Sequence, residues 1–237
     1  MLDRLPARFV HQVWGSEVWY ESSAATPILV KFISTFDNLS VQVHPGDEYA
    51  RLHHNCAGKT EMWHILRARP GARIAAGFKT PISEETLRQS AKSGDIEDLL
   101  EWHAANPGDT FFIPAGTVHS IGGGLVLCEI QQCSDIVYRL YDWGRRPPLH
   151  FERAVEVSRR EPHTPRRDVV DCDYFTVRHH RVQDPARLGP AEVAVVIEGD
   201  GKLEGQPVRA GEVWHAGREN ACFEADGHFT ALTVSVK

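Results

Sequence analysis

Three short segments of the chain carry side chains that could together bind a metal ion. The first, residues 40–45 (SVQVHP), alternates polar and apolar residues. Because successive side chains on a β-strand point to opposite faces, Ser40, Gln42 and His44 are predicted to share one face. If that face lines a closed interior, a glutamine beside a histidine needs hydrogen-bond partners or a metal ion.

The other two segments add a lysine, an acid and a second histidine. In residues 58–63 (GKTEMW) the same alternation places Lys59 and Glu61 on one face. In residues 108–122 (GDTFFIPAGTVHSIG) the glycines permit tight turns, and the proline stiffens the turn that directs His119 inward. All three segments are therefore predicted to contribute to one interior site.

The candidate metal ligands are one amide, one carboxylate and two imidazoles, on Gln42, Glu61, His44 and His119. This mixed set of nitrogen and oxygen donors suits Zn²⁺ or another borderline divalent ion. Glu48 is a rival for the carboxylate because it follows His44 closely. Residues 45–50 (PGDEYA) are typical of a turn that enters a helix, which favours Glu61.

Short strands must position these side chains, because most of the chain is rich in β-branched and aromatic runs separated by turn residues. Residues 61–68 and 73–78 flank a Pro-Gly turn and are predicted to form a hairpin. Residues 83–105 differ, since Ser83 and Asp95 are plausible N-caps of two helices inserted between strands. The sequence therefore predicts an all-β dominated fold with a small helical insertion.

The chain is expected to form two domains. Residues 161–170 (EPHTPRRDVV) are polar and proline-bearing, and are predicted to be a linker. We therefore expect a catalytic domain over 1–160 and a smaller β domain over 161–237. The second domain has His215 but no partner motif, so we expect it to bind no metal.

Composition limits the location and partners of the protein. The 26 basic and 32 acidic residues give a net charge of −6, which disfavours nucleic acid or an anionic membrane as the main partner. No apolar run is long enough to cross a bilayer, and the N-terminus lacks the apolar core of a signal peptide. Five cysteines without a C-x-x-C pair predict neither a disulfide framework nor a thiolate zinc site. We expect a soluble, cytoplasmic monomer or homodimer.

Four motifs, in order, give the chain a resemblance to a known family. They are SVQVHPGDEYA (40–50), GKTEMWHIL (58–66), PAGTVHSIG (114–122) and EIQQCSDIVYRLYDWGR (129–145). They resemble type I phosphomannose isomerases, also called mannose-6-phosphate isomerases, in the short bacterial form. These enzymes belong to the cupin superfamily, and the likeness spans roughly residues 12–160. The usual His-x-His of the first cupin motif is Gln42-x-His44 here.

The resemblance implies a cupin, or jelly-roll-like, barrel with a helical insertion and a second, smaller cupin-like unit. It also implies an aldose–ketose isomerase that interconverts mannose 6-phosphate and fructose 6-phosphate through an enediol or enediolate, with one Zn²⁺ per chain. Matched motif by motif, the zinc ligands of the family fall on Gln42, His44, Glu61 and His119.

The resemblance further implies that Lys59, Asp135 and Arg139 are active-site residues and that Trp14 borders the sugar. Strand parity allows Asp135 and Arg139 to face one cavity, where Arg139 either stabilises substrate charge or pairs with Asp135. Lys59 and Ser40 are expected to contact the phosphate or the sugar hydroxyls.

The sequence alone leaves open which residue is the catalytic base and which sugar the protein acts on or binds. Lys59, His54 and His64 are all candidates for the base that moves the proton. The chain could also act on another sugar or sugar phosphate, or bind a sugar without catalysis as a regulatory cupin.

Overall fold

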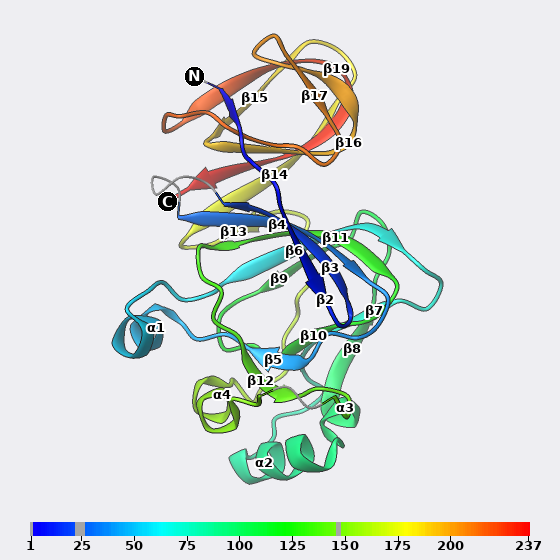
Figure 1. Cartoon of the computed structure of the whole chain (residues 1–237), viewed down its shortest axis with the longest axis vertical. Helices are drawn as coiled ribbons and strands as arrows, with labels where there is room; N and C mark the ends of the chain where they lie inside the picture. Colours follow the sequence, from blue (N-terminus) through cyan, green and yellow to red (C-terminus); the bar gives the residue numbers. More distant parts are fainter. Residues whose placement is uncertain (1, 22–26, 146–147) are drawn as a thin grey trace. The chain divides into compact units, whose positions relative to one another are not determined.

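The computed structural model of the chain describes residues 2–21, 27–145 and 148–237. These residues fold into two compact units (Figure 1). The barrel unit comprises Val10–Glu17 and Ile33–Arg167, and the terminal unit comprises Met1–Phe9, Val18–Phe32 and Asp168–Lys237. The domain boundary expected near residue 160 stays a prediction.

Two antiparallel sheets build the barrel unit. The five-stranded sheet has the order β12 (Tyr138–Tyr141), β5 (Val41–Val43), β10 (His119–Ile121), β7 (Arg73–Phe78) and β8 (Leu100–Ala104). The six-stranded sheet has the order β2 (Arg8–Gln12), β3 (Gly15–Glu21), β4 (Ile28–Thr35), β11 (Leu125–Gln132), β6 (Glu61–Ala68) and β9 (Thr110–Ile113). Strands β2, β3 and β4 contribute residues to both units.

An apolar core lies between the two sheets. Buried residues of β7 and β10, such as Ile74 and Ile121, pack against residues of β6 and β11, such as Ile65 and Leu127. Because strand side chains alternate, the remaining residues of these strands point away from this core. The interior of the barrel is therefore formed by one face of each sheet.

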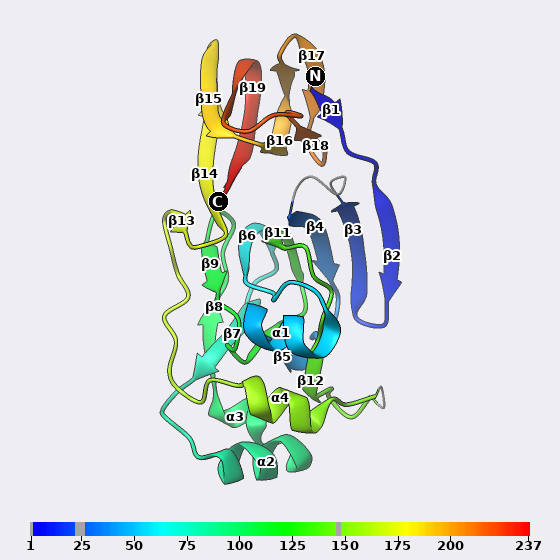
Figure 2. The same cartoon turned by 90° about the vertical axis from the view of Figure 1, so that its left-hand side faces the viewer.

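Helices cover the outer face of the five-stranded sheet. They are α2 (Glu84–Ser93), α3 (Ile96–Leu99) and α4 (Phe151–Val157), while α1 (Asp47–His54) connects β5 to β6 (Figures 1 and 2). Val41 and Val43 of β5 belong to the apolar cluster under these helices, together with Leu87 of α2 and Ala154 of α4. Because the valines of β5 face the helices, the polar residue between them, Gln42, faces the barrel interior.

The Pro-Gly turn forms as expected, but the predicted hairpin is wrong. The amide of Ala72 donates to the carbonyl of Arg69 at 3.0 Å, and Gly71 has a φ of +81° that suits glycine. The two flanking strands then separate, because β6 pairs with β9 and β11 whereas β7 pairs with β8 and β10. The turn therefore carries the chain from one sheet to the other.

The helical insertion is shorter than the predicted range of 83–105. Ser83 caps α2 as expected, since its hydroxyl accepts a hydrogen bond from the amide of Thr86. The second helix, however, ends at Leu99, and Leu100–Ala104 form β8 against β7. Pairing at the open edge of the sheet overrides the helical pattern of this stretch.

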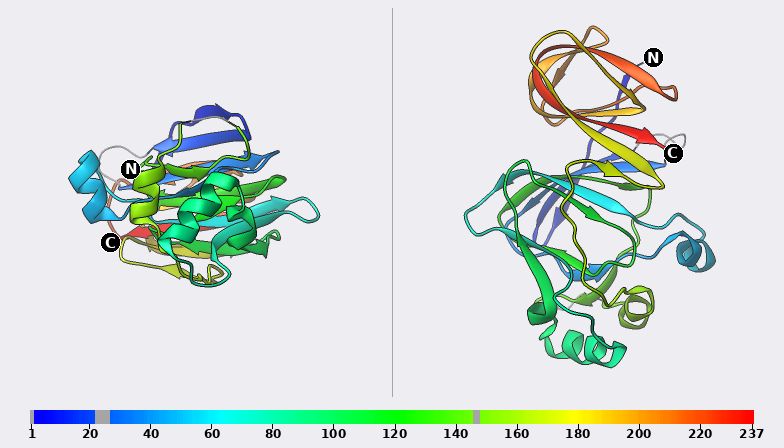
Figure 3. Two further views of the ribbon diagram at one scale, coloured as in Figure 1. Left: turned by 90° about the horizontal axis from the view of Figure 1, so that it is seen from below. Right: turned by 180° about the vertical axis from the view of Figure 1, so that it is seen from behind.

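The predicted linker is irregular in structure but is attached to the barrel unit over much of its length. The amide of Phe112 donates to the carbonyl of Pro165 at 2.7 Å, and the amide of Arg167 donates to that of Thr110 at 3.0 Å. In Figure 3 this segment runs along the barrel strands in the view from behind. It therefore packs as part of the barrel unit up to Arg167.

Most of the terminal unit is a sheet of eight strands around an apolar core that includes Phe223 and Phe229. Its strands are β1 (Asp3–Arg4), β13 (Val170–Asp171), β14 (Phe175–Val182), β15 (Ala186–Ala191), β16 (Val193–Leu203), β17 (Gln206–Arg209), β18 (Val213–His215) and β19 (Ala221–Val236). Nδ1 of His215 accepts a hydrogen bond from the amide of Gly217 at 3.2 Å. Across the described residues of both units, no helix is long and apolar enough to cross a membrane.

Candidate metal centre

Two strands of one sheet and one strand of the other bring the candidate ligands together. In the five-stranded sheet, Gln42 of β5 lies directly opposite His119, the first residue of β10. His44 follows the end of β5, and Glu61 is the first residue of β6 in the opposite sheet. All four side chains are buried, and the least buried, Gln42, is 9% exposed.

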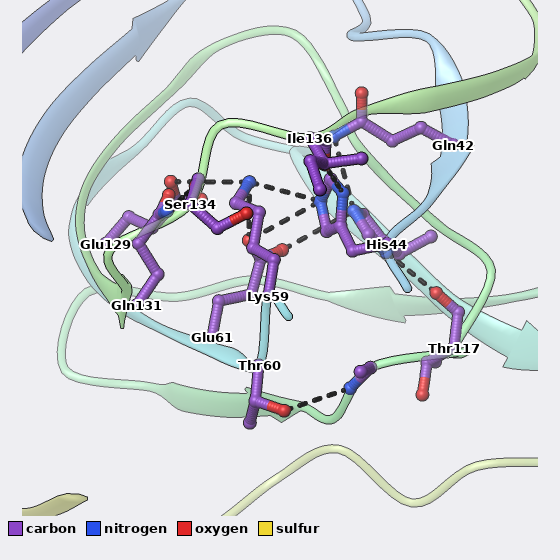
Figure 4. Close-up of polar contacts among 12 residues, drawn as sticks. Gln42, His44, Lys59, Thr60, Glu61, Thr117, Glu129, Gln131, Ser134 and Ile136 are labelled. Carbon is purple, nitrogen blue, oxygen red and sulfur yellow. Dashed lines mark hydrogen bonds and ion pairs between the residues drawn. The ribbon is translucent and has the colours of Figure 1, made fainter. Parts of the chain in front are cut away.

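His44, Glu61 and His119 form a compact cluster of ligand atoms. One such atom from each residue lies within 4.8 Å of the others. Nε2 of His44 is 3.5 Å from Oε2 of Glu61 (Figure 4). Nε2 of His119 is 3.4 Å from Oε1 of the same carboxylate. A buried carboxylate between two imidazole nitrogens is a donor set that could hold a divalent cation.

Hydrogen bonds to main-chain carbonyls set the tautomer of both histidines. Nδ1 of His44 is 2.7 Å from the carbonyl oxygen of Ile136, and Nδ1 of His119 is 2.9 Å from that of Thr117. A carbonyl oxygen only accepts, so each Nδ1 carries the proton and each Nε2 presents a lone pair to Glu61. Burial lowers the pKa of His119 to about 4, and the charge of Lys59 acts in the same direction, so the ring is neutral.

Gln42 lies at the edge of this cluster and is oriented by Ser40. The Ser40 hydroxyl donates to Oε1 of Gln42 at 3.0 Å, and Nε2 of Gln42 lies 3.3 Å from Nε2 of His119. Rotation of the amide by 180° would turn its oxygen toward the cluster and its nitrogen toward Ser40. Ser40 is itself buried, and its hydroxyl contacts the amide in either orientation.

Lys59 is the cation of this interior site. Its Nζ is 2.9 Å from Oε2 of Glu61, 3.1 Å from Nε2 of His44 and 4.0 Å from Oε1 of Glu129 (Figure 4). Burial alone would lower the pKa of Lys59, but the negative charges of Glu61 and Glu129 outweigh it and raise the pKa above its usual value. The ammonium group is therefore charged although it is almost completely buried.

Glu129 is a site residue to which the sequence reasoning assigned no role. It lies on β11 directly opposite Trp63 of β6, and its Oε2 accepts a hydrogen bond from the Trp63 indole at 2.9 Å. Trp63 also packs edge-on against the His119 ring, with centroids 5.4 Å apart. A charge inside the apolar run LVLCEIQQ is the signal that could have identified Glu129, since a buried acid requires partners.

The structure separates the two members of the expected Asp135–Arg139 pair. Arg139 of β12 lies opposite Gln42, so both side chains are on the interior face of the sheet. Asp135 is exposed in the irregular stretch before β12, where strand alternation does not apply. Among the described residues the two do not form an ion pair.

Trp14 is half-buried and packs against the barrel core. Its carbonyl accepts hydrogen bonds from the amides of Phe36 and Asp37. The next residue must be glycine, because a Cβ at Gly15 would lie 1.9 Å from the carbonyl oxygen of Ser34. This close approach of two backbones explains the Trp-Gly pair and fixes the position of Trp14.

Neither histidine considered as a base lies in the interior site. His54 is exposed at the end of α1, where its Nε2 is 2.5 Å from the Tyr138 hydroxyl. His64 alternates with Trp63 along β6 and therefore faces away from the barrel interior, with Nδ1 2.9 Å from Oγ1 of Thr110. The rival carboxylate Glu48 is exposed on α1.

Comparisons with known proteins agree on one family. The chain is 37% identical over 200 residues to mannose-6-phosphate isomerase ManA of Bacillus subtilis (strain 168), a match that covers 75% of this chain and 63% of that protein. It is 34% identical over 225 residues to the probable mannose-6-phosphate isomerase GmuF of the same strain, covering 84% of this chain and 71% of that protein. No protein-family model matches the chain.

A solved structure agrees over almost the whole chain. The crystal structure of mannose 6-phosphate isomerase from Bacillus subtilis has a TM-score of 0.85 and 26% identity, and the match covers 98% of each chain. The expected cupin fold, dominated by β-strands, is thereby confirmed. The chain spans less than two thirds of the length of ManA and just over two thirds of that of GmuF. It belongs to the mannose-6-phosphate isomerase family.

Proposed function

We propose that this chain interconverts mannose 6-phosphate and fructose 6-phosphate, with Zn²⁺ at the candidate metal centre. The observation that carries the proposal is the buried cluster of His44, Glu61 and His119 next to a charged lysine inside the barrel. The names of the relatives and of the solved structure support the same reaction.

The residues fit a divalent ion. Two imidazoles present unprotonated Nε2 atoms to one buried carboxylate, and both are held in that tautomer by main-chain carbonyls. His44, Glu61 and His119 would hold the ion, and Gln42 would join them through its amide oxygen. Such an ion, when bound, supplies Lewis-acid stabilisation of the negative charge that develops on the sugar oxygens O1 and O2.

Lys59 is suited to donate hydrogen bonds to the same developing charge. Isomerisation moves a proton between C1 and C2, and the intermediate enediolate carries negative charge next to both carbons. Glu61 and Glu129 keep the Lys59 ammonium charged in a dry interior, where a hydrogen bond to an oxyanion is stronger than in water.

The sugar phosphate would be bound and oriented by Arg139, Ser40 and Trp14. Arg139 lies on the interior face opposite Gln42, where a guanidinium can pair with substrate charge. Ser40 holds Gln42 through its hydroxyl, and Trp14 is held next to the core by its main-chain contacts. Asp135, which is exposed, would reach the substrate only from the loop before β12.

The direct test is turnover of mannose 6-phosphate to fructose 6-phosphate by the purified chain, with metal content measured on the same sample. Glucose 6-phosphate and free mannose serve as control substrates. We expect turnover of mannose 6-phosphate to exceed that of both controls and to require about one metal ion per chain. Sugar phosphate binding without turnover in the metal-loaded protein would contradict the proposal.

A further inference from the structure

Lys59 belongs to a segment whose main-chain amides are all bound by partners outside β6. It lies two residues before the start of β6. Its own amide donates to the carbonyl of Pro45 at 3.0 Å. The amides on either side, of Gly58 and Thr60, donate to the side chains of Asp47 and Gln132 at 2.8 and 2.9 Å. Three consecutive amides are therefore fixed by partners outside β6.

Asp47 and Gln132 are joined to each other. Nε2 of Gln132 donates to Oδ1 of Asp47 at 3.0 Å, the same oxygen that accepts from Gly58. Asp47 is the first residue of α1, three residues after His44, and Gln132 is the last residue of β11. This pair, which we call the Asp47–Gln132 clamp, ties together the chain after β5, the chain before β6 and the end of β11.

The backbone around Gly58 leaves no room for the segment to shift without breaking these bonds. A Cβ at Gly58 would lie 2.6 Å from the amide nitrogen of Asp47 and 2.9 Å from the carbonyl oxygen of Pro45. On the other side, the hydroxyl of Thr60 accepts a hydrogen bond from the amide of Ala115 at 3.2 Å. The main chain around Lys59 is therefore closely enclosed, and the clamp supplies the hydrogen bonds of the amides on both sides of Lys59.

We propose that Asp47 and Gln132 are positioning residues for Lys59. Neither side chain contacts the Lys59 ammonium, and both act on the peptide groups next to it. The Nζ atom lies 2.9 Å from Oε2 of Glu61 in the interior site, so a small displacement of the main chain would shift the ammonium group away from this position. The inference rests on the proposed function, in which Lys59 stabilises charge on the sugar.

Substitutions in the clamp test the proposal. Gln132→Ala and Asp47→Ala each remove the link, whereas Asp47→Asn keeps an oxygen that accepts from both Gly58 and Gln132. We expect each alanine variant to lower kcat about 10- to 100-fold, because misplacement by about 1 Å costs as much as 100-fold. KM should stay within about twofold and metal content should not change, while Asp47→Asn restores kcat to within about threefold of wild type.

A matched control comes from the other face of β6. Thr110→Val removes a half-buried side-chain hydrogen bond to His64, at 2.9 Å, and leaves the clamp intact. We expect this variant to keep the wild-type kcat. If Gln132→Ala does not fold, Gln132→Met fills the same volume and still lacks the donor and the acceptor.

Amide hydrogen exchange gives a second readout that does not need activity. In both alanine variants, exchange at Gly58 and Thr60 should be at least about tenfold faster, while Ile65 further along β6 keeps its protection. Faster exchange with an unchanged kcat would overturn the positioning role. A joint loss of kcat, metal and protection throughout the barrel would also overturn it, in favour of a purely structural role.

The two proposals fail in different ways. A wild-type protein that does not convert mannose 6-phosphate refutes the proposed function. The clamp is then judged on exchange alone, and unaltered exchange at Gly58 and Thr60 refutes it.

Discussion

Two buried glutamates, one in each unit, show how differently the two β units use the same residue. Glu192 of the terminal unit is 7% exposed, and its two oxygens accept hydrogen bonds from the amides of Asn220 and Val236 at 2.6 and 2.7 Å. Glu61 of the barrel unit is completely buried, and its oxygens face Lys59 and two imidazole nitrogens.

The difference in partners distinguishes Glu192, whose role is structural, from Glu61, for which we propose a functional role. The partners of Glu192 are two backbone amides from different parts of the terminal unit. Its carboxylate therefore links these two segments of the chain through hydrogen bonds. The side chains around Glu61 are two histidines and a lysine, and a buried group of this kind is costly to assemble unless it has a binding or catalytic role. Burial alone therefore does not identify a functional acid, whereas the identity of its partners does.

The largest effect is expected at the candidate metal centre. His119→Ala removes one of the three clustered ligands, so metal content should fall close to zero and kcat should drop by about a thousandfold or more. Metal analysis and the turnover assay on one preparation measure both losses. Retained metal with normal kcat would mean that the cluster around Glu61 is structural, like that around Glu192.

A smaller loss, without loss of metal, is expected at Arg139. Arg139→Ala keeps the His–Glu–His cluster but removes a guanidinium that faces the interior, so kcat should fall about 100-fold at an unchanged metal content. Activity within a few fold of wild type would remove Arg139 from the proposed site. Arg139→Lys, which keeps the charge but not the planar fork, should be intermediate.

In the terminal unit we expect the reverse result, a loss of stability without a loss of metal or activity. Glu192→Ala leaves the amides of Asn220 and Val236 without their acceptor, which should cost about 2 kcal/mol of unfolding free energy. The midpoint of thermal unfolding should fall by about 4–8 °C. Metal content and kcat should be unchanged, and a loss of metal in this variant would break the distinction between the two acids.

The smallest effect is expected at His54, which is exposed on α1. Because its ring contacts Tyr138 and not the interior site, His54→Gln should change kcat by less than about twofold across the pH range of activity. A tenfold loss, or the disappearance of an ionisation from the pH profile, would return His54 to the list of candidate bases.

Much of the site could be predicted from local rules. Alternation along β5 and β6 was sufficient to place Gln42, His44 and Glu61 on interior faces, because strand side chains have a strict period of two. The turn before β10 was also predicted, since glycine and proline impose it whatever the rest of the fold.

Other features depended on contacts that the sequence does not display. The residues on either side of the Pro-Gly turn look like a hairpin, yet β6 and β7 join different sheets. Asp135 lies outside β12, so counting parity from Arg139 extended the strand too far. Glu129 was assigned no role because its neighbours are apolar, although its partners Trp63 and Lys59 come from distant positions in the chain.

We propose that one zinc ion binds between His44, Glu61 and His119 inside the barrel. Anomalous diffraction from a crystal of the purified protein, recorded on both sides of the zinc absorption edge, tests it most directly. We predict a single strong peak, present only above the edge, within bonding distance of Nε2 of both histidines and of the Glu61 carboxylate. Zinc found elsewhere on the chain, with nothing bound between these three side chains, would rule out this metal site.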